Sequence, residues 1–102
     1  MKNLMMWKER GYEGAPSVKT LIGKPSKHKD LILKYLTEHG VFRDASTGYG
    51  KDLITGDIIS GTCEGMDDGE YAWMSTLPYY VEKYNISLPE TFVKKVIETY
   101  GQ

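Results

Sequence analysis

The sequence predicts one small α+β domain in which about three short antiparallel strands pack with three helices, in the order helix, strands, helix, helix. Three segments carry apolar residues at helical spacing, and the stretch 41–74 carries short β-prone runs broken by glycine and aspartate. The chain has 102 residues, the usual size of one domain. Helices that are separate from an antiparallel sheet along the chain are typical of the α+β class.

Residues 1–25 are the least regular part of the chain. Glycines and prolines interrupt them at Gly11, Gly14, Pro16, Gly23 and Pro25. Because these residue types mark turns and loops, we expect residues 1–25 to form a loosely structured N-terminal arm or edge segment. Residues 26–102 are expected to form the compact core of a single domain that spans residues 1–102.

The first predicted helix covers about residues 27–39. Four apolar residues recur on one helical face within it, namely Leu31, Ile32, Tyr35 and Leu36. The hydroxyl of Ser26 is placed to cap the first turn. Gly40 is placed to end the helix in the left-handed conformation, which glycine adopts without strain.

A β-region is predicted after this helix. Val41-Phe42 is expected to begin a strand, and residues 44–50 are expected to form a loop. The segment 53–59 has two β-prone pairs on either side of Gly56-Asp57. This arrangement predicts a hairpin.

A second loop is expected in the acidic, glycine-rich stretch 64–70. Tyr71 and Trp73 follow it and alternate with Ala72 and Met74. Because side chains alternate between the two faces of a strand, this pattern predicts a third strand with both aromatic rings on one face.

Two helices are predicted at the end of the chain. Ser75 is placed to cap the first of them, with Pro78 in the first turn, where a missing amide costs little, and with Asn85 as its stop. Ser87 and Glu90 have the spacing of a capping box, which predicts the start of the last helix.

Composition indicates a globular protein of a reducing compartment. Aromatic residues make up 12% of the chain, whereas disordered chains are poor in them. Cys63 is the single cysteine, so no disulfide can form within the chain. The apolar run 4–7 is shorter than a signal-peptide core, and no segment has the length and hydropathy of a membrane span. We therefore expect a soluble cytoplasmic protein that does not bind membranes.

Charge is distributed unevenly along the chain. Residues 1–43 hold nine lysines and arginines against four acids, a formal charge of +5, and residues 44–102 hold four lysines against ten acids, a formal charge of −6. Such asymmetry favours an anionic partner for the first half or a basic partner for the second. The alternative is that the two halves pack together and neutralise each other.

The acidic stretch and the aromatic residues after it form the main predicted site. Its residues are Glu64, Asp67, Asp68, Glu70, Tyr71, Trp73 and, as an exposed extension, Tyr79. Acidic residues accelerate the encounter with a basic surface, and aromatic residues are frequent anchors of protein interfaces. We therefore expect a non-enzymatic binding protein, of an inhibitor or immunity type, that presents this surface to a basic protein. The alternative is a solvated turn with Trp73 in the core.

A basic cluster at the start of the first helix supports a second hypothesis, a nucleic-acid or phosphate-binding module. Its residues are Lys24, Ser26, Lys27, His28 and Lys29, to which Lys19 and Lys34 add charge. A helix N-terminus favours anions, but the spacing is not that of a phosphate-binding P-loop. A solvated basic turn is the alternative.

Other chemistries lack the spacing they need. The acidic stretch does not match a calcium-binding loop, and His28 and His39 are about 16 Å apart along a helix, too far to share a metal ion. Cys63 lies in no protease signature. We therefore expect no metal and no cofactor, and a small enzyme is only a third hypothesis. A homo-oligomer remains an open alternative.

Overall fold

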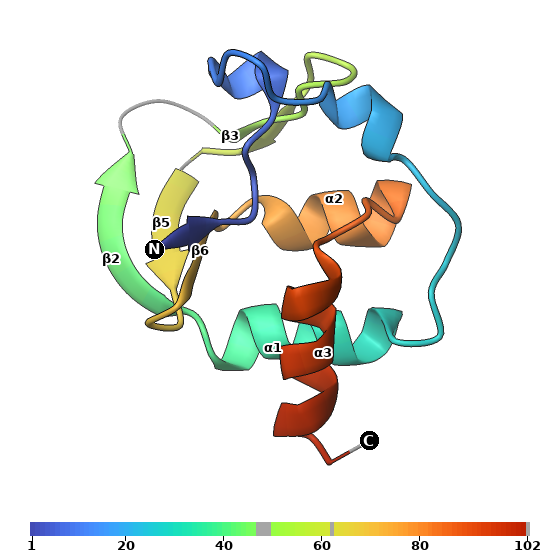
Figure 1. The fold of residues 1–102 in the computed structure, drawn as a ribbon. Coiled ribbons are helices and arrows are strands. Elements are labelled where there is room, and N and C mark those ends of the chain that lie inside the picture. Colours follow the sequence, from blue (N-terminus) through green and yellow to red (C-terminus); the bar gives the residue numbers. More distant parts are fainter. Residues whose placement is uncertain (47–49, 62, 102) are drawn as a thin grey trace.

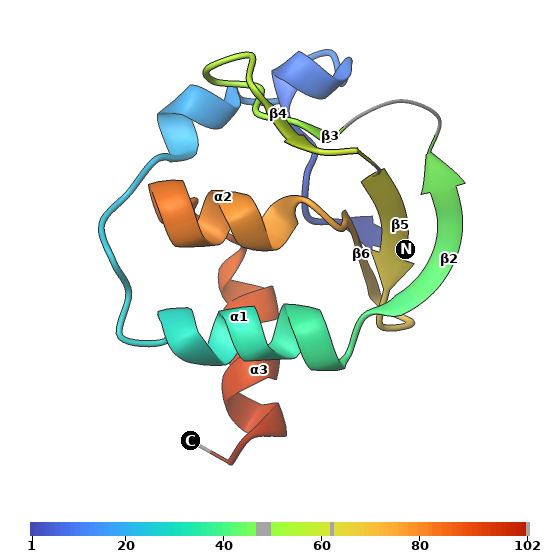
Figure 2. The same ribbon diagram turned by 180° about the vertical axis from the view of Figure 1, so that it is seen from behind.

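The computed structural model describes residues 1–46, 50–61 and 63–101. Its larger sheet has the strand order β1-β6-β5-β2 and consists of β1 (Lys2–Asn3), β6 (Tyr71–Met74), β5 (Cys63–Asp67) and β2 (Val41–Ser46). A second sheet pairs β3 (Gly50–Lys51) with β4 (Ile58–Ser60). The helices are α1 (Lys29–Glu38), α2 (Leu77–Tyr84) and α3 (Glu90–Thr99), with short 3-10 helices at Lys8–Arg10 and Val18–Leu21. Figure 1 and Figure 2 show this arrangement from opposite sides.

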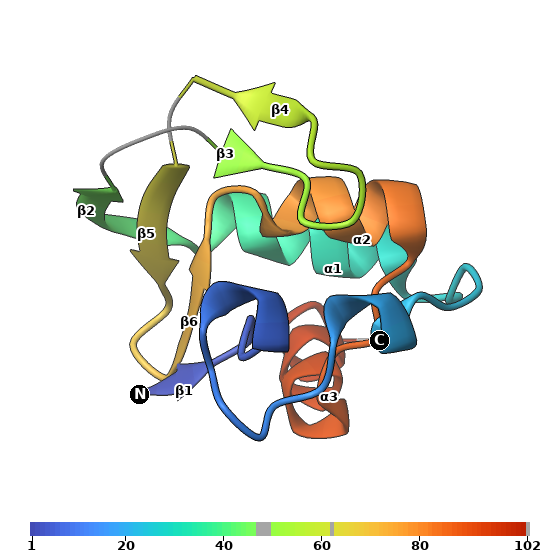
Figure 3. The ribbon, with the colours of Figure 1, turned by 90° about the horizontal axis from the view of Figure 1, so that it is seen from above.

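Among the described residues the α+β class with three α-helices is confirmed, but the sheet is wider than expected. Four strands form the main sheet instead of about three, and β1 runs parallel to β6, so the sheet is mixed. The order of elements also differs, because a strand and two 3-10 helices precede α1. Figure 3 shows the main sheet on one side of the molecule and the three α-helices on the other.

The N-terminal residues are part of the core. Leu4, Met5, Trp7 and Val18 are buried, and the ring of Trp7 packs edge-on against Tyr80 of α2 at 4.9 Å. Burying a ring of this size stabilises a small domain by several kcal/mol. Lys2–Asn3 of this segment forms the edge strand β1.

The helix caps differ from the predicted ones. His28, not Ser26, precedes α1, and the hydroxyl of Ser26 accepts a bond from the His28 amide outside the helix. Thr76 instead of Ser75 precedes α2, and Pro89 precedes α3 without a side-chain cap, so the capping box is absent there.

Of the two predicted helix ends, the one at Asn85 is confirmed and the conformation predicted for Gly40 is wrong. Asn85 does end α2, in the left-handed conformation with φ of 51°. Gly40 follows α1, but its φ is not positive, so the predicted left-handed conformation is wrong and the reason for glycine there is space. A Cβ at Gly40 would lie 2.9 Å from Cζ2 of Trp73.

Two predicted loops are largely strand. Residues 44–46 belong to β2, while 47–49 of that expected loop lie outside the described residues. The segment 63–67 forms β5 and only the turn at 68–70 remains of the second loop. Because β5 pairs with β2 on one side and β6 on the other, backbone pairing outweighs its weak intrinsic strand propensity. The third strand, with Tyr71 and Trp73, is confirmed.

The predicted hairpin is present with different strands. Gly50–Lys51 pairs with Ile58–Ser60, so Leu53 and Ile54 lie in the connecting loop and not in a strand. The reason is a loop built around the side chain of Asp52, which accepts bonds from the amides of Ile54 and Thr55.

Candidate functional site

The acidic turn between β5 and β6 is neutralised within the molecule. Asp67 accepts a 2.8 Å bond from Nε of Arg43, and Asp68 pairs with Nζ of Lys95 at 3.0 Å. Glu70 pairs with Lys95 at 3.1 Å and with Lys2 at 3.6 Å. Lys95 belongs to α3 and pairs with two acids of the turn, whereas Lys2 and Arg43 come from the basic half of the chain.

Hydrogen bonds hold Asp68 in its ionised form. Burial alone raises the pKa of Asp68, but bonds from the Tyr35 hydroxyl at 2.5 Å, from the amides of Tyr71 and Glu70, and from Lys95 lower it to about 2. Burial, followed by the hydrogen bond to Asp68, raises the pKa of Tyr35 to about 12. The turn is therefore a structural charge cluster that ties β5–β6 to α1 and α3.

The expected aromatic anchors do not reach the surface. Tyr71 and Trp73 are buried in the core, where both rings lie edge-on to Phe92 of α3. This corrects the hypothesis of an acidic and aromatic docking surface, because an anchor must be exposed before it binds. Glu64 lies on β5, half-buried, and is not part of the turn.

Tyr79 is also engaged inside the molecule. Its hydroxyl donates a 2.7 Å bond to Asp52, and Lys83 donates to the same hydroxyl at 3.0 Å. Tyr84 donates a second 2.7 Å bond to Asp52, and Tyr80 donates to the carbonyl of Lys51. These tyrosines of α2 therefore fasten the loop that begins at Asp52.

Asp52 is a buried structural residue that sequence reasoning missed. Burial alone raises its pKa, but hydrogen bonds from Tyr84, Tyr79 and the amides of Thr55 and Ile54 lower it to about 2. Every hydrogen bond that its carboxylate makes in the described structure is to this loop or to α2. It is an anchor of the fold, and no pattern in the sequence pointed towards it.

The basic segment lies where α1 begins. Lys24, Ser26 and Lys27 are exposed and His28 is half-buried. Lys29 contacts α2, because its Nζ donates a 2.9 Å hydrogen bond to the backbone carbonyl of Glu82. The space bordered by Lys24, Ser26 and Lys29 is only about 30 Å³, which is room for about one water molecule.

β2 is an open edge of the main sheet. Among the described residues it pairs only with β5, and Val41 and Phe42 at its start are 50% and 54% exposed. The pairing shifts register between Phe42 and Asp44, which marks Arg43 as a bulge. β2 has six residues and is the longest described strand.

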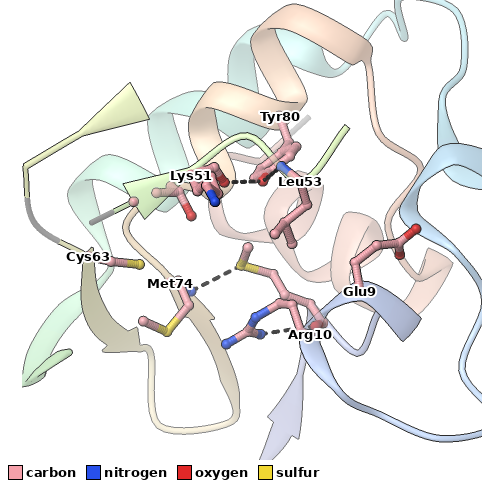
Figure 4. A pocket seen from close by; sticks show the side chains of 10 residues that line it. Glu9, Arg10, Lys51, Leu53, Cys63, Met74 and Tyr80 are labelled. Atoms are coloured by element: carbon pink, nitrogen blue, oxygen red, sulfur yellow. Dashed lines mark hydrogen bonds between the residues drawn. The ribbon is translucent and has the colours of Figure 1, made fainter. Parts of the chain in front are cut away.

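A cavity of about 240 Å³ lies between the N-terminal segment, the loop after β3, and strands β5 and β6 (Figure 4). Its walls are mostly uncharged, with Met5, Cys63, Met74, Leu53 and Tyr80 among them. Glu9, Arg10 and Lys51 are its charged residues. The carboxylate of Glu9 is occupied, because it accepts bonds from the hydroxyl of Ser17 and the amide of Val18.

Metal ligands of the usual kind do not gather in the part of the chain that the structure describes: it contains no group of three histidine, cysteine, aspartate or glutamate side chains able to hold an ion. None of the described helices is long and apolar enough to span a bilayer.

Comparison with known proteins finds no match: neither a protein-family model, nor a curated protein, nor a solved structure corresponds to this chain.

Proposed function

We propose that the protein is a non-enzymatic binding module that takes up an extended segment of a basic protein partner along the edge of β2. The observation that carries the proposal is an open strand edge that begins with two half-exposed apolar side chains, Val41 and Phe42. An added strand gains affinity from main-chain hydrogen bonds and specificity from alternate side chains. Monomeric proteins usually cover or shorten such an edge.

Charge around β2 supports a basic partner. Asp44 lies on β2 and Glu64 lies on β5 beside it, opposite Ala45 in the register. Neither carboxylate takes part in a salt bridge among the described residues, in contrast to Asp67, Asp68 and Glu70. A basic segment that runs along β2 therefore lies next to Asp44, with Glu64 one strand further into the sheet. The expected attraction of a basic surface moves from the acidic turn to this edge.

The edge also carries features that act against indiscriminate pairing. The bulge at Arg43 and the charges of Arg43 and Asp44 interrupt a flat apolar edge, and such devices reduce edge-to-edge association of identical chains. A partner strand must therefore match the bulge and the two charges, which restricts this edge to a specific partner.

Selection from a random peptide library displayed on phage tests the proposal. We expect enriched peptides with apolar residues at alternate positions and with lysine or arginine between them. Labelled synthetic copies should bind wild-type protein and perturb the backbone amide signals of 41–46. N-methylation of alternate peptide amides should abolish binding, because it removes the main-chain donors of an added strand.

A matched pair of variants completes this experiment. Phe42→Asp should abolish peptide binding, whereas Ile58→Asp, at another exposed apolar side chain on β4, should leave it intact. Equal binding by both variants, or an enriched set without basic residues, would contradict the proposal. If light scattering shows that the wild-type protein is a dimer and that Phe42→Asp is a monomer, a second copy of the chain occupies the edge. That result would also overturn the proposal.

A further inference from the structure

Three sulfur-bearing side chains border the cavity of Figure 4, and each comes from a different element. Met5 lies in the N-terminal segment, Cys63 begins β5 and Met74 ends β6. Cys63 and Met74 are half-buried, whereas Met5 is almost fully buried. Thiolate and thioether sulfur are soft ligands, which select soft ions such as Cu(I).

The register of the sheet brings Cys63 and Met74 to one face. Gly65 lies directly opposite Met74, and Cys63 precedes Gly65 by two residues, so all three share a face. Cys63 and Met74 are therefore diagonal neighbours, at a Cβ spacing of roughly 7 Å, which long side chains bridge.

A hydrogen bond fixes the third sulfur next to this pair. The amide of Met74 donates to Sδ of Met5 at 3.2 Å, the dashed line beside Met74 in Figure 4. The sulfur of Met5 therefore faces β6. Methionine has three rotatable bonds, so the sulfur of Met74 can adjust to a ligand that Met5 and Cys63 share.

We propose that Cys63, Met74 and Met5 form a binding site for a soft monovalent metal ion, of which Cu(I) is the biological example. The ion replaces the proton of the Cys63 thiol, so one proton leaves for each ion bound, and the two thioethers complete a three-sulfur set without any redox change. This site is separate from the edge of β2 and does not depend on the proposed function.

Charge selects a monovalent ion over a divalent one. A thiolate and a monovalent cation are neutral together, and the thioethers add no charge. A divalent ion bound to the thiolate would leave a net positive charge beside Arg10 and Lys51. The carboxylate that borders the cavity, Glu9, is already hydrogen-bonded to Ser17 and Val18. Hard divalent ions also prefer oxygen ligands.

Titration of the reduced protein with Cu(I), in competition with a chromogenic Cu(I) chelator, tests the proposal. Wild-type protein should bind one ion and release one proton, and X-ray absorption should show three sulfur neighbours. Cys63→Ser should abolish this binding. Met74→Leu should weaken it at least about tenfold, because it removes a ligand and keeps the side-chain volume.

The control is Met6→Leu, an exposed methionine next to Met5 that does not border the cavity, and its affinity should equal that of wild type. Met5→Leu conserves core volume, and circular dichroism establishes whether it folds. If Met5→Leu does not fold, the Cu(I) affinity of Met74→Leu alone tests whether the thioethers are ligands. Wild-type affinity in Met74→Leu, or a single sulfur neighbour in X-ray absorption, would mean binding by the thiol alone and would overturn the three-sulfur site.

Discussion

The hydroxyl of Tyr84 donates a 2.7 Å hydrogen bond to the carboxylate of Asp52, whose side chain has no exposed surface. The other oxygen of the same carboxylate accepts bonds from the amides of Ile54 and Thr55. One buried carboxylate thereby joins the loop after β3 to α2, 32 residues further along the chain. This loop also forms one wall of the cavity that Met5, Cys63 and Met74 border.

Asp52→Ala should lower the free energy of unfolding by roughly 3 kcal/mol. The substitution leaves two loop amides and two tyrosine hydroxyls without their acceptor, and hydrogen bonds to a charged group are the stronger ones. Urea unfolding followed by circular dichroism measures the loss. Asp57→Ala, at an exposed aspartate of the same loop, is the control and should change stability by less than about 0.5 kcal/mol. Equal losses in both variants would show that the Asp52 bonds contribute little.

Stability should fall in acid as the pH drops from about 4 to about 2. In the folded protein the pKa values of Asp52 and Asp68 are about 2, below the ordinary value of 3.8. Because the unfolded chain takes up these protons first, the stabilisation is complete above pH 4 and is lost as the pH falls through the folded pKa values. Urea midpoints measured between pH 5 and pH 2 test this. Asp68→Asn should reduce the fall of the urea midpoint with pH. A wild-type midpoint that does not change with pH would contradict this prediction.

Gly40→Ala should destabilise the protein by about 1–3 kcal/mol, the usual cost of overpacking. The added Cβ would lie 2.9 Å from the buried ring of Trp73 and 3.0 Å from the backbone oxygen of Leu36, which cannot move aside independently of α1. Gly61→Ala is the matched control, because no described atom lies within 4 Å of its Cβ and its φ is not positive. Thermal unfolding of the two variants should separate them, and a neutral Gly40→Ala would disprove the close contact.

Trp7→Ala should cost about 3–5 kcal/mol, as expected for a large ring removed from a core. Trp7 is 1% exposed and packs edge-on against Tyr80. Met6→Ala, at the adjacent exposed residue, should be close to wild type. Urea unfolding measures the stability of both variants. Equally small losses of unfolding free energy in Trp7→Ala and Met6→Ala would contradict the role of the N-terminal segment in the core.

Local patterns predicted the helices better than the strands. The apolar faces of α2 and α3 are visible at helical spacing, and Asn85 adopts the left-handed conformation at the end of α2. The pattern of Tyr71 and Trp73 gave β6 for a similar reason, since both side chains enter one core. β5 was expected to be a loop, because its glycine and acids disfavour a strand until two neighbouring strands pair with it.

The predicted docking site was less accurate than the predicted helices, because its exposure depends on which charged side chains pair in the folded protein. The acidic stretch was recognisable by composition, but its pairing with Lys95 and Arg43 depends on residues 24 or more positions away. The open edge of β2 and the sulfur atoms around one cavity have no local signature. Val41 and Phe42 resemble core residues in sequence, and only the strand order leaves them at the edge.

By itself, the sequence determined the α+β class, the three α-helices and the inward face of β6, because periodic burial follows from the spacing of apolar residues along one element. The tertiary structure alone decided that the acids of the turn neutralise partners within the chain, that Asp52 fastens a loop, and that β2 ends the sheet. These features depend on contacts between distant segments, whose geometry is set only when the whole core packs.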